Sequence, residues 1–139
     1  MSKIGFTCGA FDIKHAGHDL MFEECKNFCD FLIVGLHVDP STERKEKNKP
    51  IQTVYERFVQ LTSSKYIDQV IPYDSENDLL NILKTIGIKI RFVGSDYIEK
   101  DFTGKDLCKK LNIEIFYNTR FHTFSSSSLR KRIAEAENK

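Results

Sequence analysis

Short apolar runs alternate with amphipathic stretches along this chain. Residues 31–36 read FLIVGL without interruption, which is typical of a strand that is covered on both faces. Between such runs, apolar residues recur at helical spacing, as Met21, Cys25 and Phe28 do. The pattern predicts strands at 3–8, 31–37, 69–72, 90–93 and 114–117, and helices at 18–28, 53–63, 77–85, 104–111 and 126–136.

This alternation predicts an α/β fold with a Rossmann-like, doubly wound, five-stranded parallel sheet and helices on both faces. Ser75 is placed to cap the third helix together with Asp78, and Gly87 is placed to end it. Such sheets bind ligands beyond the carboxyl ends of their strands, where the strand order reverses. The segments that follow four of the strands are therefore expected to meet at one edge: 9–18, 37–39, 94–97 and 120–128.

Composition narrows the class of protein. With 139 residues, 40% of them hydrophobic, the chain is expected to form a single domain over 1–139. A net charge of +1 gives no general attraction to nucleic acid or membrane. The apolar runs are too short to cross a bilayer, and the first residues lead into a strand without a signal peptide. The four cysteines form no CxxC pair, so we expect reduced thiols in a cytoplasmic protein.

Two histidines stand where the first predicted strand passes to the first predicted helix. A helix start presents unpaired N–H groups and the positive end of the helix dipole, which attract phosphate. His15 and His18 can point at one anionic group there, and Gly17 between them lets the backbone approach a ligand closely. Two alternatives stay open: a capping or surface histidine, and a zinc site completed by Asp12.

A second anion-binding segment is predicted at 120–128. Arg120 supplies a fixed charge and a planar fork that suits phosphate oxygens. Ser125 is well placed as the N-cap of the last helix. A serine run is usually a flexible linker, but this one lies between a predicted strand and a helix that carries Leu129 and Ile133.

The HxGH element after the first strand and the arginine followed by a serine-rich turn together resemble the two signatures of the nucleotidyltransferase superfamily. Within it the chain is most similar to glycerol-3-phosphate cytidylyltransferases, over about residues 3–133, including their GxFD segment at 9–12. The resemblance implies catalytic roles for His15, His18, Lys47 and Arg120. It implies nucleotide binding by Gly9, Ala10, Phe11, His15, Gly17, His18, Asp96, Arg120, Ser125, Ser126 and Ser127, substrate binding by Lys45 and Arg57, and no metal held by side chains.

The reaction implied by the resemblance moves CMP from CTP to a phosphorylated small alcohol, first of all glycerol 3-phosphate, and yields CDP-glycerol and pyrophosphate. Such a transfer needs positioning and charge neutralisation but no serine or cysteine nucleophile. Mg²⁺ is expected to enter with CTP, and Asp96 is expected to lie near the base. The resemblance also implies a homodimer. The charge, the short apolar runs and the cysteines imply a cytoplasmic protein with no nucleic-acid partner and no membrane insertion.

Several positions depart from the cytidylyltransferase pattern. Segment 94–97 reads GSDY and also resembles the GGDY of adenylyltransferases that make ADP-heptose. Lys65 stands where the cytidylyltransferases carry an arginine, so the bidentate geometry is lost. Two alternatives therefore remain: an adenylyltransferase that uses ATP on a sugar phosphate, and a catalytically silent nucleotide-binding module.

Overall fold

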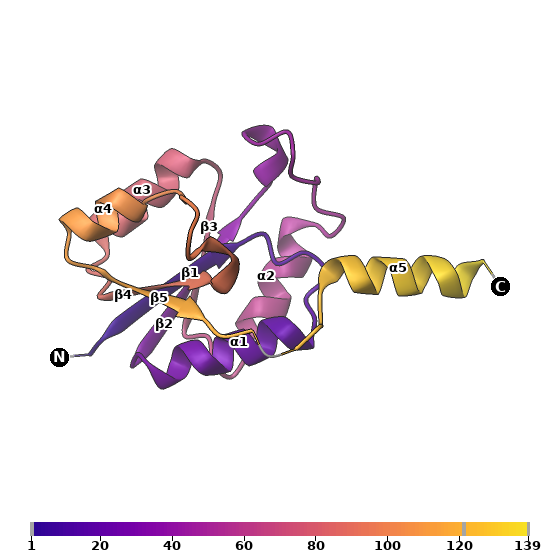
Figure 1. Cartoon of the computed structure of the whole chain (residues 1–139), viewed down its shortest axis with the longest axis horizontal. Coiled ribbons are helices and arrows are strands. Elements are labelled where there is room, and N and C mark those ends of the chain that lie inside the picture. The colour runs from indigo at the N-terminus through magenta and orange to yellow at the C-terminus, as the bar shows by residue number, and fades with distance from the viewer. Residues whose placement is uncertain (1, 121, 139) are drawn as a thin grey trace.

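The computed structural model describes residues 2–120 and 122–138. Five parallel strands form one sheet in the order β3–β2–β1–β4–β5 (Figure 1). The strands are β1 (Ile4–Gly9), β2 (Phe31–His37), β3 (Gln69–Tyr73), β4 (Ile90–Gly94) and β5 (Glu114–Asn118). The helices are α1 (Ala16–Asn27), α2 (Val54–Thr62), α3 (Glu76–Thr85), α4 (Lys105–Lys110) and α5 (Ser126–Glu137), with short 3-10 helices η1 (Pro40–Thr42) and η2 (Ser95–Tyr97). The predicted α/β class is confirmed, and every predicted element forms within one or two residues of its expected bounds.

Helices cover both faces of the sheet, as predicted. One apolar layer joins α1 and α2 to the sheet, and the other joins α3 and α4 to the opposite face. Alternate residues of β2 divide between these layers, since Leu32 and Val34 belong to the first and Ile33 to the second. The uninterrupted apolar run at 31–36 therefore reflects burial on both sides.

Local signals end the elements where the sequence indicates. Ser75 accepts a hydrogen bond from the backbone N of Asp78 at 3.1 Å, and Asp78 accepts one from the backbone N of Ser75, which completes a capping box. Gly87, just beyond α3, has φ of +80°, a left-handed conformation that favours glycine. The caps of α3 are thus as predicted.

Helix α5 differs from the other helices. It projects from the body of the molecule (Figure 1), and none of its described residues is buried. Leu129 is half-buried and Ile133 is 53% exposed, so the apolar pair does not pack on the sheet. The fifth helix therefore covers neither face. In the part of the chain that is described, no helix combines the length and apolar character needed to span a membrane.

Arg57 has a different place from the substrate contact that the sequence predicted. It is only 2% exposed, in the interior between α2 and the carboxyl ends of β1 and β2. Its guanidinium donates to the backbone carbonyls of Ala10 (3.1 Å), His37 (2.8 Å), Val38 (2.7 Å), Gln52 (3.2 Å) and Thr53 (3.3 Å). This corrects the prediction, because a guanidinium spent on interior carbonyls is not offered to a substrate. Arg57 instead joins three segments of chain.

Replacement of Arg57 by Met should destabilise the protein without ligand by at least about 3 kcal/mol, because several buried carbonyls lose their donor. Arg120→Met is the matched control, since Arg120 is exposed and lies on a loop, and should change stability by about 0.5 kcal/mol or less. Urea unfolding measures both. Should Arg57→Met not fold, Arg57→Lys should still lose more stability than the control. Equal stabilities of the Arg57 and Arg120 variants would contradict the structural role.

Candidate functional site

The carboxyl edge of the sheet carries two adjoining cavities. The histidine cavity, of about 220 Å³, is lined by Phe11, His18, Ser126 and Arg130 among others. The arginine cavity, of about 260 Å³, is lined by His37, Tyr73, Arg91, Tyr97 and Thr103 among others, next to the β1–β4 pair where the strand order reverses. The two share Ala10, Pro40 and Lys47. The predicted meeting of four loops at one edge is confirmed, and both cavities lie at this edge, where sheets of this type bind ligands.

The two histidines of the motif cap α1 reciprocally. His15 is the N-cap residue, and its Nδ1 accepts from the backbone N of Gly17 at 3.0 Å. His18 Nδ1 in turn accepts from the backbone N of His15 at 3.2 Å, and the ring centroids are 3.9 Å apart. Because each Nδ1 is an acceptor, the proton of each neutral ring lies on Nε2. The capping alternative thus holds, and it also orients both rings with an Nε2–H donor.

Both rings are held neutral. Burial lowers the pKa of His18 to about 3, and repulsion from His15, Lys14 and His122 adds to the effect. Burial also lowers the pKa of His15, followed by repulsion from His122 and Arg120. At neutral pH the pair therefore offers hydrogen-bond donors without carrying full charges. Positive charge at this site has to come from lysine and arginine.

Gly17 is required by the side chains around it. A Cβ atom there would lie 2.7 Å from Cε1 of His122 and 2.8 Å from Cε1 of His15. His122 is thus brought from the serine-rich turn to the start of α1, beside His15. Sequence reasoning gave His122 no role, although a third histidine within the second signature was a signal for it.

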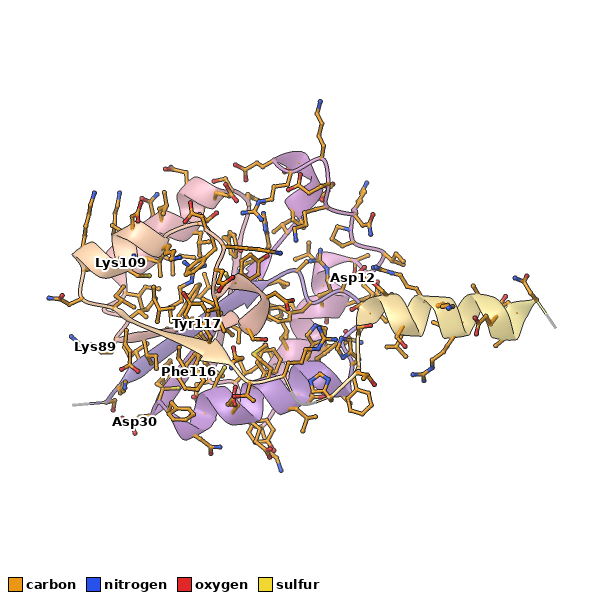
Figure 2. All side chains as sticks on the ribbon, viewed as in Figure 1. Asp12, Asp30, Lys89, Lys109, Phe116 and Tyr117 are labelled. Carbon is orange, nitrogen blue, oxygen red and sulfur yellow. The ribbon has the colours of Figure 1, made fainter. Side chains whose placement is uncertain are left out.

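Asp12 ties three segments together beside the histidine cavity. Its carboxylate accepts from the backbone N atoms of Ile51 and Gln52, both at 2.9 Å, and from Arg130 Nη2 at 2.8 Å. The Ser126 hydroxyl donates to the Asp12 carbonyl at 3.2 Å, so Asp12 lies at the start of α5 (Figure 2). Burial alone would raise the pKa of Asp12, but these backbone hydrogen bonds and Arg130 lower it.

The zinc alternative finds no support in this geometry. The Asp12 carboxylate faces amides and Arg130, and both histidine Nδ1 atoms are already acceptors. Among residues 2–120 and 122–138, no three histidine, cysteine, aspartate or glutamate side chains are placed to hold a metal ion. The four cysteines are free thiols, and burial raises the pKa of Cys25 to about 12.

The loop between β1 and α1 is held in a strained form. Phe11 has φ of +50° and Ile13 has φ of +52°, values that non-glycine residues rarely adopt. The Phe11 ring is 8% exposed and packs against Phe22 and His18, with centroids at 5.3 and 5.4 Å. Phe11 lines the histidine cavity but leaves only a small part of its surface for the predicted nucleotide contact.

The predicted basic residues separate into two groups. Lys47 is exposed and lines both cavities, whereas Lys45 is exposed and lines neither. Arg120 is exposed, donates from Nη2 to the Phe124 carbonyl at 2.9 Å, and is close enough to His15 to act on its pKa. Lys47 therefore lies beside both cavities and Arg120 lies near His15 but lines neither cavity, while the expected role of Lys45 as a substrate ligand lacks a cavity contact.

Some of the remaining predicted residues line a cavity and others do not. Gly9 and Ala10 line the arginine cavity, and Ser126 lines the histidine cavity. Ser125 caps α5 by accepting from the backbone N of Ser128 at 3.0 Å, as predicted. The last two, Asp96 in η2 and Ser127 in α5, are exposed and line neither cavity. Position 121 of the serine-rich segment lies outside the described residues.

The histidine geometry predicts how acid affects stability. The unfolded chain binds a proton at His18 below about pH 6.5, whereas the folded chain does not until about pH 3. Acid therefore favours unfolding, and the contribution of His18, fully present above pH 6.5, is lost as the pH falls. Between pH 7.5 and 5.0 this amounts to about 2 kcal/mol. His18→Asn is the matched variant, because the amide oxygen can accept from His15 N but does not titrate.

Urea unfolding at the two pH values should show a smaller loss in His18→Asn than in the wild type, by about that amount. The other histidines are present in both proteins, so the difference between the two losses reports His18 together with its effect on the neighbouring His15. Equal losses would mean that His18 takes up its proton in the folded state.

Comparison with known proteins places the chain. A family model described as "Cytidylyltransferase-like" matches residues 6–132. The chain is 34% identical over 136 residues to "Bifunctional protein HldE" of Campylobacter curvus, covering 97% of this chain and 28% of that protein. It is 35% identical over 132 residues to the protein of the same name in Wolinella succinogenes, covering 94% of this chain and 27% of that protein. The chain thus spans just over a quarter of these curated relatives.

Solved structures share the fold. A lipopolysaccharide core biosynthesis protein from Thermoplasma volcanium superposes with a TM-score of 0.72 at 24% identity, over 88% of this chain and 100% of that one. A pantoate-beta-alanine ligase from Francisella tularensis gives 0.62 at 15% identity, over 99% and 72%. Those identities speak for the fold alone. Since the family model matches residues 6–132, a range that includes the HxGH element and the serine-rich turn of this chain, the chain belongs to the cytidylyltransferase-like family of the nucleotidyltransferase superfamily.

Proposed function

We propose that this chain transfers AMP from ATP to a phosphorylated sugar and releases pyrophosphate. The observation that carries the proposal is the neutral histidine pair at the start of α1, beside two cavities that share Lys47. The histidine cavity suits the nucleotide phosphates, and the arginine cavity suits the acceptor. Nucleotidyl transfer needs such an arrangement, in which two anionic reactants meet at fixed donors.

Two features favour ATP and a sugar phosphate over the expected CTP and glycerol 3-phosphate. Segment 94–97 is similar to the GGDY of adenylyltransferases that make ADP-heptose, and Tyr97 of this segment lines the arginine cavity. The curated relatives carry the name HldE rather than that of a glycerol-3-phosphate cytidylyltransferase. Transfer of CMP to glycerol 3-phosphate therefore receives less support than the adenylyl alternative.

The proposed chemistry follows from the hydrogen-bond donors and charges that line the two cavities. An oxygen of the acceptor phosphate attacks the α-phosphorus of the nucleotide in line. The bond from that phosphorus to the bridging oxygen breaks, and its electron pair leaves with pyrophosphate. His18 donates from Nε2 to phosphate oxygens in the histidine cavity, with Ser126 beside it, while Lys47 supplies charge where the two cavities adjoin. Because His18 is neutral, it stabilises the transition state as a preorganised donor rather than as an acid.

Mg²⁺ fits this scheme as a companion of the nucleotide. In the described part of the chain no side-chain cluster could hold the ion alone, so the triphosphate would supply most of its ligands. When bound, the ion neutralises charge on the phosphates. The homodimer stays a prediction, which light scattering coupled to size-exclusion chromatography tests.

A pyrophosphate-release screen tests the reaction. ATP and CTP are each offered with aldose 1-phosphates, glycerol 3-phosphate and choline phosphate in the presence of Mg²⁺. We expect release from ATP with an aldose phosphate. Release from CTP with glycerol 3-phosphate alone would contradict this and support the cytidylyltransferase alternative. Nucleotide binding by calorimetry without release from any pair would identify the silent module.

His18→Ala should lower kcat by about 10²–10³-fold, the usual effect of removing one preorganised donor. Lys109→Ala on α4 is the control, because Lys109 is exposed and lies far from Asp12 in Figure 2, and its kcat should equal that of the wild type. Steady-state kinetics measure both, and circular dichroism verifies folding. A folded His18→Ala protein with wild-type kcat would contradict the proposed role of the histidine.

A further inference from the structure

Arg91 is a buried cation in the wall of the arginine cavity. It lies on β4 and is only 4% exposed. Its Nη1 donates to the Thr103 carbonyl, its Nη2 lies 3.7 Å from Cys8 Sγ, and its Cζ lies 4.8 Å from the centroid of the Phe102 ring. These partners fix the position of the guanidinium, but none of them carries a negative charge.

Among the described residues, none forms an ion pair with Arg91. Its Nε–H is buried without a hydrogen-bond partner among residues 2–120 and 122–138. Glu76, which lines the same cavity, is already bound by Arg44 at 2.6 Å and by the Thr103 hydroxyl at 2.8 Å. A buried, unpaired cation with an unused donor is costly, and a ligand anion in the cavity would offset that cost.

Arg57 provides a contrast within the same protein. It is as deeply buried as Arg91, but it donates to five backbone carbonyls and lines neither cavity. Arg91 has one backbone acceptor, the thiols of Cys8 and Cys108, and a cavity beside it. The comparison separates an arginine that holds the fold from one that is left with binding capacity. His37, whose Nε2 is also buried without a partner, lines the same cavity.

Arg91 also lies apart from the reacting centre. His18 lines the histidine cavity and Arg91 the arginine cavity, and Lys47 belongs to both. An acceptor whose reacting phosphate lies beside Lys47 would extend its remaining atoms into the arginine cavity. The far end of such an acceptor would meet Arg91.

We propose that Arg91 binds a second anionic group of the acceptor, so that the acceptor class is a phosphorylated compound with a carboxylate or another phosphate remote from the reacting one. The inference rests on the proposed function and deepens it. Arginine suits the task because its planar donors match both kinds of oxyanion. A neutral polyol end would leave the buried charge without compensation.

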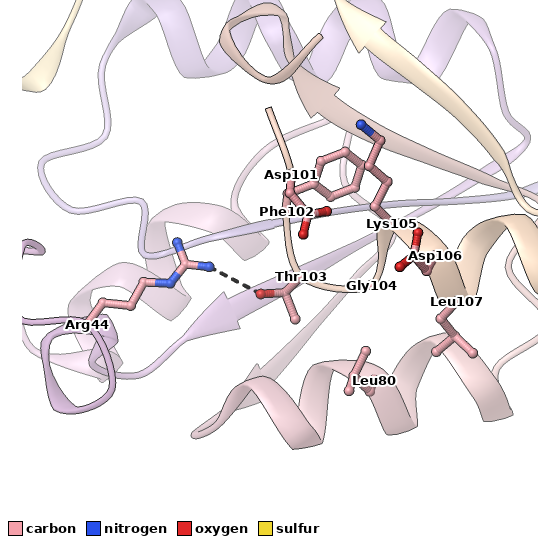
Figure 3. Close-up of a pocket in the computed structure, with 9 residues that line it drawn as sticks. All are labelled: Arg44, Leu80, Asp101, Phe102, Thr103, Gly104, Lys105, Asp106 and Leu107. Atoms are coloured by element: carbon pink, nitrogen blue, oxygen red, sulfur yellow. Dashed lines mark hydrogen bonds between the residues drawn. The ribbon is translucent and has the colours of Figure 1, made fainter. Parts of the chain in front are cut away.

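The neighbouring segment 101–104 keeps Arg91 in place. Gly104 has φ of +87°, and a Cβ atom there would lie 2.9 Å from Arg91 Nη1 and 2.6 Å from Leu83 Cδ1. Arg44 donates to the Thr103 hydroxyl at 3.1 Å, and this pair borders a further cavity of about 370 Å³ on the outer side (Figure 3). A purely structural Arg91 that only holds this segment is the competing explanation.

Matched acceptors distinguish an Arg91 that binds the acceptor from an Arg91 that is purely structural. Glucose 1-phosphate and glucuronate 1-phosphate differ by a carboxylate, glucose 1,6-bisphosphate adds a phosphate, and glycerol 3-phosphate pairs with 3-phosphoglycerate. Calorimetry measures their binding to the whole chain, with and without α,β-methylene-ATP. We expect the wild type to bind at least one acidic member about 10-fold or more tightly than its neutral-ended partner. The carboxylate and bisphosphate arms show which oxyanion fits.

Arg91→Met should abolish this preference and leave the affinity for the neutral-ended partner nearly unchanged. Arg91→Lys, which keeps the charge but not the fork, should retain a weaker preference and serves if the Met variant does not fold. Equal affinity for both members of every pair in the wild type would overturn the proposal, and so would a preference that persists in Arg91→Met. A loss of melting temperature without any preference in the wild type would leave Arg91 a purely structural residue.

The readout separates this inference from the proposed function. A preference for acidic acceptors in binding, with no pyrophosphate release from any pair, would remove the proposed reaction and leave the role of Arg91 in place. Release with neutral-ended acceptors at the same kcat/KM as with acidic ones would retain the reaction and overturn the role of Arg91.

Discussion

Arg57 holds the carboxyl edge of the sheet together by donating to backbone carbonyls from three separate segments. Asp12 does the complementary work, since its carboxylate accepts from two backbone N–H groups and from Arg130. Between them these side chains satisfy backbone groups that loops would otherwise leave unpaired near the interior. They also hold the loop with left-handed Phe11 and Ile13 in place. The positions of the histidines depend on that loop.

The histidine pair shows how local hydrogen bonding can prepare a site for chemistry. Each Nδ1 is used to cap α1, so each ring turns a defined donor away from the helix. Burial and repulsion from neighbouring charged groups hold the pair neutral, with the pKa of His18 lowered to about 3. A neutral donor needs little reorganisation when charge develops on phosphate. In the proposed reaction Lys47 and Arg120 would supply positive charge, and both are exposed.

Two buried arginines divide structure from binding at this edge. The guanidinium of Arg57 is surrounded by carbonyls, whereas that of Arg91 faces a cavity and has no counter-ion in the part of the chain that the structure describes. Both side chains are large, charged and almost fully buried, so burial alone does not distinguish their roles. The number of hydrogen-bond acceptors around each guanidinium distinguishes the two roles. Glu76, whose Oε1 is bound by Arg44 and by the Thr103 hydroxyl, forms no ion pair with Arg91.

The sequence by itself determined the succession of strands and helices along the chain, the caps of α3 and α5, and the meeting of the loops at one edge. These follow from apolar periodicity and from short-range capping, which depend on neighbours within a few residues. Only the tertiary structure decided that Arg57 is internal, that α5 leaves the sheet, and that Lys45 and Asp96 line neither cavity. The sequence also contained no sign that the charge of Arg91 would lack an ion-pair partner among the described residues, because Arg91 lies within an otherwise apolar strand. The partners of a buried guanidinium come from segments that are distant in the sequence. A local sequence pattern therefore cannot predict which carbonyl or carboxylate will contact it.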